Sequence, residues 1–225
     1  MSTNDASLTP LSQISLRISE IFFSLQGESS RVGLPTVFIR LTGCPLRCTW
    51  CDTTYAFTGG SAKTIAEILA ETAKHGTRTV CVTGGEPLAQ KNCLPLLTAL
   101  CNAGFDVSLE TSGALDIGSV DPRVARIVDL KAPGSGESDK NLWTNLPQLR
   151  ASDEVKMVLA DRADYEWARN TIATHHLTDT CPVLLSPVQG TLQPADLANW
   201  ILADHLPVRF QLQLHKVLWG NMQGK

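Results

Sequence analysis

The chain has 225 residues, a formal net charge of −3 at pH 7 and a composition that is 43% hydrophobic. This length supports one sizeable hydrophobic core, and no shift in composition marks a second domain. Because there is no basic surplus to neutralise a phosphate backbone, we expect no nucleic-acid partner, and a small-molecule substrate fits better. No apolar run approaches the length of a membrane span, so no membrane association is expected either.

Seven cysteines raise the question of redox state. The chain begins MSTNDASLTP, without the basic and apolar segment of a secretory signal, so we expect a cytoplasmic protein with reduced thiols. Cys81, Cys93, Cys101 and Cys181 lie in apolar runs, which predicts buried packing roles for them. The three remaining cysteines are clustered and need another explanation.

The predicted elements alternate along the chain. Residues 1–13 are rich in Ser, Thr, Asn and Asp and predict a flexible tail, which leaves 14–225 as a single domain. Hydrophobic patterning predicts strands at 16–25, 37–41, 79–82, 106–109, 126–130, 154–159, 183–185 and 208–214, and helices at 64–75, 94–103, 164–175 and 194–204. Parallel neighbouring strands need a crossover, so this order predicts an α/β fold, a partial barrel of about six parallel strands.

Polar clusters follow most of these strands. They are Thr42-Gly43, Thr83-Gly84-Gly85-Glu86, Glu110-Thr111-Ser112-Gly113, Asp129-Leu130-Lys131, Ser186-Pro187 and His215-Lys216. Ligands of parallel α/β folds bind at the carboxyl ends of the strands, so these clusters are expected to converge on one mouth. The general polarity of loops is an alternative that accounts for about half of them.

The stretch GCPLRCTWCDTT contains three thiols, Cys44, Cys48 and Cys51, in CxxxCxxC spacing. A cubane iron-sulfur cluster held by three cysteines keeps one iron open to an outside ligand, whereas a closed structural site uses four protein ligands. No fourth cysteine lies nearby, which favours the open cluster. A zinc site completed by Asp52 or by a distant histidine stays open on spacing alone.

A second motif, TGGEP at 83–87, follows the predicted strand at 79–82. A glycine pair after a strand lets backbone groups approach a small zwitterion, and Glu86 is expected to receive its ammonium group. With both motifs the sequence resembles the radical S-adenosylmethionine (SAM) enzymes. That resemblance implies a four-iron, four-sulfur cluster on the three cysteines, with the methionine part of the cofactor on the open iron.

Six further stretches make the resemblance more specific: FSLQGES at 23–29, FIRLTGCPLRCTWCDTTYAF at 38–57, TGGEPL at 83–88, LETSG at 109–113, DLKAPGSGE at 129–137 and LQLHKVLWG at 212–220. Together they resemble the 7-carboxy-7-deazaguanine synthase family. The resemblance implies a radical-initiated ring contraction of 6-carboxy-5,6,7,8-tetrahydropterin to 7-carboxy-7-deazaguanine and ammonia. This is a lyase reaction on the route to queuosine, a modified tRNA nucleoside, and to other deazapurines.

The resemblance also implies roles for individual residues. SAM contacts are expected from Trp50, Cys51, Asp52, Gly85, Glu86, Glu110, Ser112, Asp129, Leu130, Lys131, Ser186 and Gln189. Thr53 matches a position whose hydroxyl coordinates Mg²⁺ in the family, although a turn-capping hydroxyl is the ordinary role of a lone threonine. Substrate contacts are expected from Leu25, Gln26, Gly27, Glu28, Arg40, Thr83 and His215. Arg40 presents a fork suited to a carboxylate, and Gln26 and Glu28 suit the donor-acceptor edge of a pterin.

The same resemblance implies a homodimer and an electron donor such as flavodoxin or ferredoxin. Two alternatives remain: an activase that abstracts hydrogen from a glycine of a partner protein, and a zinc-binding interaction module.

Two departures from the family pattern matter. Ser29 stands where glycine is common, and Lys225 lies ten residues beyond His215, which argues against a substrate contact from the end of the chain.

Overall fold

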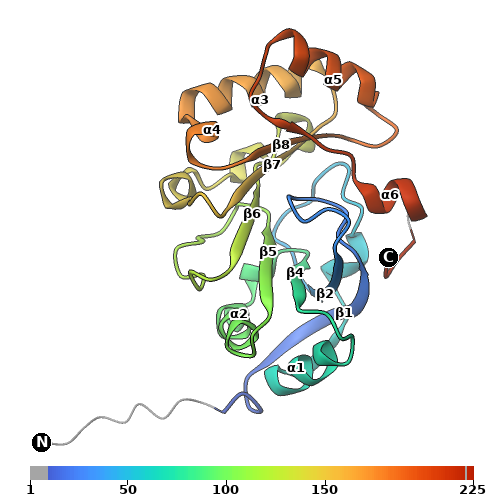
Figure 1. Cartoon of the computed structure of the whole chain (residues 1–225), viewed down its shortest axis with the longest axis vertical. Helices are drawn as coiled ribbons and strands as arrows, with labels where there is room; N and C mark the ends of the chain where they lie inside the picture. Colours follow the sequence, from blue (N-terminus) through green and yellow to red (C-terminus); the bar gives the residue numbers. More distant parts are fainter. Residues whose placement is uncertain (1–9, 221) are drawn as a thin grey trace, which may run out of the picture.

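The computed structural model describes residues 10–220 and 222–225, which form one nine-stranded sheet with the order β3-β1-β2-β4-β5-β6-β7-β8-β9. Figure 1 shows the sheet running from the β1 region at the lower end of the molecule to β8 at the upper end, with helices at both ends. The strand order and the helical crossovers confirm the predicted α/β fold, and the mostly parallel sheet is consistent with the predicted partial barrel.

The first edge of the sheet is antiparallel. β1 (Ser15–Leu25) pairs with β2 (Pro35–Leu41) on one side and with the short β3 (Ser61–Thr64) on the other. The sequence predicted β1 and β2 but not β3. This edge brings the end of β1 beside the strand that leads into the cysteine loop.

The remaining pairings are parallel, from β2 to β9. The strands are β4 (Thr79–Gly84), β5 (Asp106–Thr111), β6 (Ala125–Asp129), β7 (Glu154–Leu159), β8 (Val183–Pro187) and β9 (Arg209–Phe210). Parallel strands place their carboxyl ends at one edge of a sheet. The polar clusters that follow β2, β4, β5 and β6 therefore meet.

Helices supply several of the crossovers. The α-helices are α1 (Ile65–Ala73), α2 (Cys93–Asn102), α3 (Arg162–His175), α4 (Leu177–Thr180), α5 (Pro194–Ala203) and α6 (Leu214–Trp219). Short 3₁₀ helices occupy Thr54–Phe57, Pro87–Ala89, Pro133–Ser135, Ser138–Lys140 and Trp143–Gln148. The predicted capping box of α1 is present, since Thr64 and Glu67 each accept a hydrogen bond from the other's backbone N–H.

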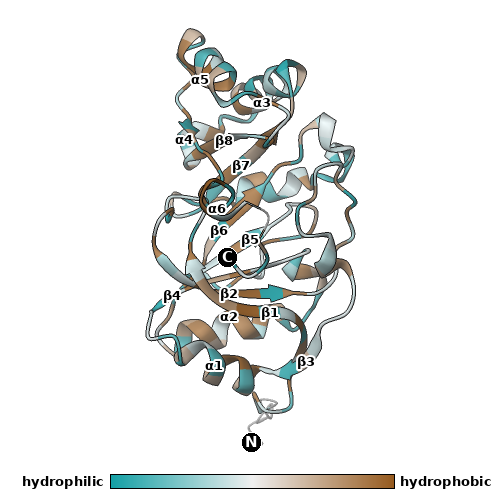
Figure 2. Ribbon diagram, turned by 90° about the vertical axis from the view of Figure 1, so that its right-hand side faces the viewer, coloured by the Kyte–Doolittle hydropathy of each residue, from teal (hydrophilic) through white to brown (hydrophobic). Residues whose placement is uncertain are grey.

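Strict alternation along the strands separates the core from the functional face. In β2, Val37, Ile39 and Leu41 are fully buried in the core, whereas Phe38 and Arg40 between them face a cavity. One core cluster lies around β1, β2, β4 and β5 with α1 and α2, and a second lies around β6, β7 and β8 with α3 and α5. Figure 2 shows hydrophobic colour on the central strands and on parts of α1 and α2.

The end of the chain differs from prediction. A strand over 208–214 was expected, but pairing stops at Phe210 and the chain enters α6 at Leu214, so the prediction is wrong beyond Phe210. The Gln211 side chain explains the departure, because it donates to the Ser29 carbonyl at 2.8 Å and accepts from the Ser29 N–H at 2.7 Å. These side-chain bonds tie Gln211 to the loop after β1, while its backbone N–H makes a last bond to the sheet, at 3.0 Å from the Leu185 carbonyl of β8.

The flexible tail expected over 1–13 stays a prediction. Residues 1–9 of the predicted flexible tail lie outside the described residues. Residues 11–13 form a turn, closed by a 2.8 Å hydrogen bond from the Gln13 N–H to the Pro10 carbonyl. Among residues 10–220 and 222–225, no helix has the length and hydrophobicity needed to cross a bilayer.

Candidate active site

A cavity of about 630 Å³ lies at the carboxyl ends of the parallel strands. Nineteen residues predicted for the site line it: Leu25, Gln26, Gly27, Glu28, Arg40, Cys44, Cys48, Trp50, Cys51, Asp52, Thr53, Thr83, Gly85, Glu110, Ser112, Asp129, Lys131, Gln189 and His215. Three predicted residues, Glu86, Leu130 and Ser186, lie outside this lining. Four of the six polar clusters therefore converge on this cavity as expected, whereas Thr42-Gly43 and Ser186-Pro187 do not line it.

The cysteine loop forms one wall. Cys44, Cys48 and Cys51 are all partly buried, free of disulfides and exposed to this cavity. The loop is fixed from outside by the Thr49 N–H, which donates to the Ser135 carbonyl at 2.9 Å. Burial raises the pKa values of Cys44 and Cys48 above the ordinary thiol value, so in the metal-free protein both are held as thiols.

The donor set fits a polynuclear centre. Three soft thiol ligands from one short loop are the ligands that iron-sulfur clusters use. Within residues 10–220 and 222–225, no three His, Cys, Asp or Glu side chains are close enough together to hold one metal ion. Three thiols spread around one wall suit a centre large enough to bridge them, and the zinc alternative has no compact ligand set in this part of the chain.

The glycine pair after β4 packs against this loop. A Cβ on Gly85 would lie 2.4 Å from the Gly43 carbonyl oxygen and 2.7 Å from the Cys44 Cβ, so only glycine allows the approach. The Gly85 N–H donates to the Leu41 carbonyl at 3.1 Å, and the Glu86 N–H to the Gly43 carbonyl at 2.7 Å. The end of β2 and the cysteine loop therefore use these two N–H groups, which fixes the glycine pair beside the three cysteines.

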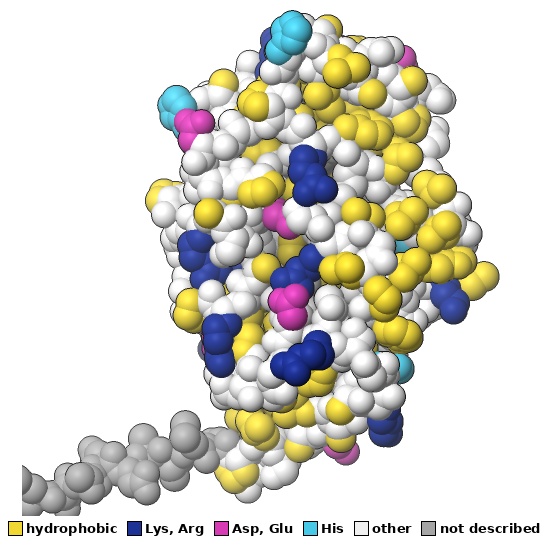
Figure 3. Space-filling model, viewed as in Figure 1, with side chains coloured by type: hydrophobic (Ala, Val, Ile, Leu, Met, Phe, Trp, Pro, Cys, Tyr) yellow, Lys and Arg dark blue, Asp and Glu magenta, His cyan; other side chains and the backbone are white. Residues whose placement is uncertain are grey.

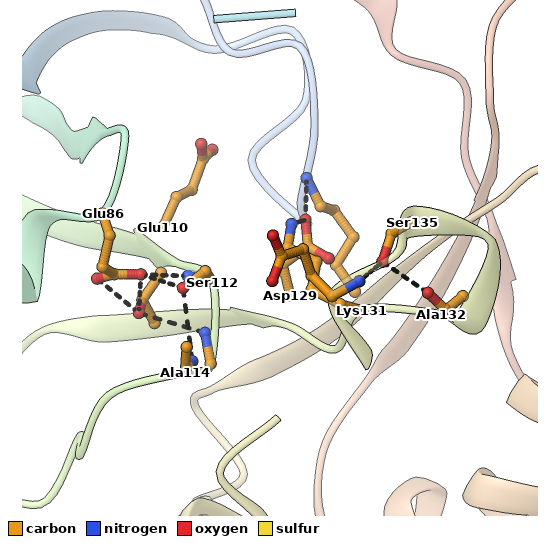
Figure 4. A network of polar contacts seen from close by, with 12 residues as sticks. Glu86, Glu110, Ser112, Ala114, Asp129, Lys131, Ala132 and Ser135 are labelled. Atoms are coloured by element: carbon orange, nitrogen blue, oxygen red, sulfur yellow. Dashed lines mark hydrogen bonds and ion pairs between the residues drawn. The ribbon is translucent and has the colours of Figure 1, made fainter. Parts of the chain in front are cut away.

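Glu86 is fully buried and anchors the end of β5. Its carboxylate accepts from the Ser112 N–H at 2.6 Å, from the Ser112 hydroxyl at 2.5 Å and from the Leu88 N–H at 2.9 Å. Thr111 also donates to it. Figure 4 shows this network, with Glu110 pointing away from Glu86. The predicted direct contact from Glu86 to a cofactor ammonium does not match this geometry, because its acceptors are already occupied by the chain.

Leu130 and Ser186 are the other two predicted residues outside the lining. The Leu130 side chain belongs to the hydrophobic core, as alternation from Asp129 and Lys131 requires. Ser186 is fully buried in β8, and its hydroxyl has no hydrogen-bond partner among residues 10–220 and 222–225. Gln189, just beyond β8, does line the cavity.

The opposite wall is built from the segment after β1 and from α6. Gly27 packs on His215, since a Cβ there would lie 2.1 Å from the His215 Nδ1. The Gly27 carbonyl accepts from the Leu214 N–H at 2.9 Å, and Glu28 accepts from the Gln213 side chain at 2.7 Å. Burial lowers the pKa of His215 below its usual value, so its imidazole is neutral at pH 7. Ser29 has a positive φ of 66°, a conformation in which glycine is favoured.

Arg40 projects from β2 into the cavity with its orientation fixed. Its Nε donates to Glu20 at 2.8 Å, and the Tyr55 hydroxyl donates to the same carboxylate oxygen at 2.8 Å. The guanidinium lies 5.7 Å from the centroid of Phe22, which stacks on Phe38 at 4.9 Å. With Nε occupied by Glu20, the two terminal nitrogens of Arg40 remain to form a bidentate pair with a carboxylate.

The structure adds lining residues that the sequence did not suggest, including Lys156, Gln213 and Lys225, and it places Lys216 of the expected His215-Lys216 cluster in the cavity. Lys156 contacts the carboxylates of Glu28 and Asp129, and Lys131 pairs with the same Asp129 oxygen at 3.0 Å. Lys156 interrupts the apolar run EVKMVL as Arg40 interrupts VFIRL, and that signal was available in the sequence. Lys225 also lines the cavity, although it lies ten residues beyond His215 in the sequence.

Asp52 and Thr53 lie where the two walls meet. Asp52 forms a 2.7 Å ion pair with Lys216 of α6, and the Thr53 hydroxyl donates to the other Asp52 oxygen at 2.8 Å. Burial alone would raise the pKa of Asp52, but Lys216 and this hydrogen bond lower it to about 2. Asp52 is thus an anion at any neutral pH, and the Thr53 oxygen keeps lone pairs available for a cation.

Known proteins share both the sequence and this fold. The radical SAM superfamily model matches residues 38–133. A 7-carboxy-7-deazaguanine synthase from Chlorobaculum tepidum is 48% identical over 208 residues, covering 91% of this chain and 94% of that protein. The same enzyme from Koribacter versatilis is 44% identical over 219 residues, covering 91% and 97%.

The chain belongs to the 7-carboxy-7-deazaguanine synthase family. The crystal structure of QueE from Escherichia coli superposes with a TM-score of 0.75 at 27% identity, covering 91% of this chain and 96% of that one. Streptococcus suis SuiB, at 14% identity and a TM-score of 0.59, shares the fold. Membership of this radical SAM family confirms the resemblance deduced from the motifs and implies a four-iron, four-sulfur cluster and SAM. It favours the synthase over both the activase and the zinc module.

Proposed function

We propose that this protein converts 6-carboxy-5,6,7,8-tetrahydropterin to 7-carboxy-7-deazaguanine and ammonia in queuosine or other 7-deazapurine biosynthesis. The observation that carries the proposal is one cavity with two dissimilar walls. The thiols of Cys44, Cys48 and Cys51 line one, and Arg40, Gln26 and Glu28 line the other. A radical enzyme for a polar, carboxylated heterocycle needs both sets of groups within reach of each other.

On the first wall, Cys44, Cys48 and Cys51 would hold the cluster. When bound, the cluster supplies an electron and SAM supplies the radical that starts the ring contraction. The proposed SAM contacts that line the cavity are Trp50, Cys51, Asp52, Gly85, Glu110, Ser112, Asp129, Lys131 and Gln189. Glu86 is proposed to act indirectly by holding Ser112 in place, and Leu130 and Ser186 would contribute backbone or packing only.

On the second wall, Arg40 would bind the substrate carboxylate. Glu20 and Tyr55 hold its guanidinium, so little side-chain ordering would remain to be done on binding. Gln26, Glu28 and Thr83, together with the backbone of Leu25 and Gly27, would bind the pterin ring. His215, neutral at pH 7, can accept or donate one hydrogen bond to a ring heteroatom.

Thr53 is proposed to contribute one oxygen ligand to Mg²⁺. A single hydroxyl binds Mg²⁺ weakly, so the ion would need substrate oxygens and water to complete its octahedral shell. The neighbouring Asp52 carboxylate supports the site electrostatically, since its low pKa keeps it charged. The ion would therefore bind with the substrate and not before it.

Three further properties are proposed from family membership: a cytoplasmic setting, an electron donor such as flavodoxin or ferredoxin, and a homodimer. Exposed apolar side chains of α6 and its neighbours support self-association, notably Leu212, Val217, Leu218 and Met222, which are 40–62% exposed. Figure 3 shows hydrophobic side chains gathered on the side of the molecule where α6 lies. Light scattering on purified protein would measure the dimer directly.

The reaction is tested with anaerobically reconstituted protein. We expect a brown protein that, with reductant, SAM and Mg²⁺, converts the carboxytetrahydropterin to the deazaguanine product with matching ammonia. The activase alternative predicts cofactor cleavage with the pterin left intact. Unchanged pterin in the presence of active cluster and every additive would contradict the proposed function.

A further inference from the structure

Lys156 has a position in the cavity that the reaction outlined above does not use. It lies in the middle of β7, between Val155 and Met157, which are fully buried in the core. Alternation turns the Lys156 side chain to the opposite face, where it lines the cavity and remains only 9% exposed. Burying an ammonium group away from water is unfavourable unless carboxylates compensate its charge.

Two carboxylates compensate Lys156, and they come from different walls. Its ammonium group bonds the Glu28 carboxylate in the segment after β1 and lies 3.4 Å from Asp129 Oδ2 at the end of β6. The two carboxylates differ in their other partners. Asp129 also pairs with Lys131 at 3.0 Å, whereas among the described residues Glu28 has Lys156 as its one ion-pair partner.

Other charged groups surround this pair. From α6, His215 and Lys216 face the same space, and from β5, Glu110 does so. Glu28 itself accepts a 2.7 Å hydrogen bond from Gln213, while its backbone N–H donates to the Gln26 side chain at 3.2 Å. Without Lys156, Glu28 would therefore accept hydrogen bonds from neutral donors only, whereas Asp129 would keep its ion pair with Lys131.

We propose that Lys156 is a positioning residue for substrate selection, which keeps Glu28 an oriented carboxylate that accepts the N–H donors of an amino-pyrimidinone ring. This inference rests on the proposed function of the cavity. An anionic acceptor favours a pterin, which presents an exocyclic amine. It disfavours a lumazine, which presents a carbonyl oxygen at the same place.

The proposal predicts a change in the pH at which Glu28 takes up a proton when Lys156 is removed. Burial by itself would raise the pKa of Glu28, but the charge of Lys156 and the hydrogen bonds from Lys156 and Gln213 lower it below the ordinary value. Without Lys156 the effect of burial dominates, so Glu28 takes up a proton at higher pH than in the native protein. A protonated Glu28 loses an acceptor for the pterin amine and gains a donor for the lumazine carbonyl.

The test compares Lys156→Met with Lys156→Arg, using pterin-6-carboxylate and lumazine-6-carboxylate as non-reacting ligands. At pH 7 we expect Lys156→Met to weaken pterin binding about 10- to 100-fold, the loss of one charged hydrogen bond. Binding should recover as pH rises and Glu28 ionises, and the preference for pterin over lumazine should shrink. Lys156→Arg should restore most of the pterin affinity and most of the preference for pterin over lumazine. The matched control is Lys63→Met, whose lysine pairs with Glu71 at 2.8 Å in β3 and α1, away from the cavity.

A double variant separates positioning from a merely structural effect. If Lys156 acts through Glu28, then adding Lys156→Met to Glu28→Gln should change pterin binding by less than about threefold. SAM affinity should stay within about threefold of native in Lys156→Met, because Asp129 keeps Lys131. The inference is overturned if Lys156→Met weakens pterin and SAM binding equally at every pH. It is also overturned if the effects of Lys156→Met and Glu28→Gln on pterin binding add up in the double variant.

The two proposals fail in different ways. If native protein leaves carboxytetrahydropterin unconverted, the proposed function is wrong. If native protein converts it while Lys156→Met retains native pterin affinity and native pterin preference, only the role of Lys156 is wrong.

Discussion

The two walls of the cavity are constructed in contrasting ways. The wall lined by the three clustered cysteines, proposed to bind the cofactor and called here the cofactor wall, contains short contiguous motifs, since Cys44 to Thr53 and the pair Gly84-Gly85 each supply neighbouring groups through backbone turns. The substrate wall is assembled from single side chains of distant segments, such as Arg40 on β2, Lys156 on β7 and His215 on α6. Backbone hydrogen bonds and glycine packing hold the motifs of the first wall, whereas ion pairs orient Arg40 and Lys156 on the second.

This difference separates general chemistry from selectivity. A cluster and a nucleoside cofactor need the same local geometry whatever the substrate, so a motif can encode their site. A substrate site needs a particular pattern of charges, which this chain obtains by placing one charged residue in the middle of otherwise apolar strands. Variants on the two walls should therefore fail in different assays.

The largest expected effect is on the cofactor wall. Cys48→Ala removes one of three cluster ligands, and we expect 5′-deoxyadenosine formation to fall to background, at least about 1,000-fold, because the radical chemistry depends wholly on the cluster. Chromatographic measurement of 5′-deoxyadenosine with excess SAM and reductant, alongside iron content, checks this.

The matched control for that loss is Cys101→Ala. Cys101 is a free, partly buried thiol on α2 that does not line the cavity. It should retain native iron content and cofactor cleavage. Full activity of Cys48→Ala would break the assignment of the whole cofactor wall.

The next effect should appear on the substrate wall alone. Arg40→Lys keeps the charge but loses the planar fork that Glu20 orients, so we expect KM for the carboxytetrahydropterin to rise about 10- to 100-fold. Equilibrium dialysis should show SAM affinity unchanged. Arg31→Lys, whose arginine pairs with Asp106 outside the cavity, serves as the control. Equal damage to SAM binding would show that the walls are not separable.

The contrast also explains how far the sequence could predict the fold. Periodicity located the principal strands because each core-facing row, such as Val155, Met157 and Leu159, is continuous and apolar. Periodicity missed β3, which has no buried row, and extended the last strand beyond Phe210. The Gln211 hydrogen bonds to Ser29 that end that strand join residues 182 positions apart, and no local pattern contains them.

The candidate site was likewise predictable where its residues belong to local sequence motifs. Residues within motifs lie in the cavity almost without exception, and the exceptions have a physical reason. The Glu86 carboxylate is hydrogen-bonded to Ser112, and the Leu130 side chain packs in the core because side chains alternate along the segment. Lys156 was missed because one lysine in a strand is not a motif, and its significance depends on Glu28, 128 residues away. Charged residues that interrupt core strands deserve the weight that motifs receive.

A smaller effect should arise at the seam between the walls, at the proposed Mg²⁺ position. Thr53→Ala removes the hydroxyl oxygen while Asp52 keeps its partner Lys216, so we expect the Mg²⁺ concentration for half-maximal activity to rise about tenfold. Titration of activity with Mg²⁺ measures this, and Thr53→Ser, which restores the hydroxyl, should return the native value. An unchanged Mg²⁺ requirement in Thr53→Ala would remove Thr53 from the site.

The smallest effect should come from the ion pair that crosses the seam. Lys216→Met breaks its pair with Asp52, whose side chain is 42% exposed, so solvent screening limits the expected loss of SAM affinity to about threefold. The pKa of Asp52 is lowered from 3.8 to about 2, so the pair is complete above 3.8 and is lost only as pH falls through about 2. SAM affinity of native protein should therefore show no Asp52 titration near neutral pH. Lys140→Met, whose lysine pairs with Asp139 on the surface, should leave it unchanged. A loss many times larger in Lys216→Met would mean that α6 positions the cysteine loop, and that the two walls are mechanically one unit.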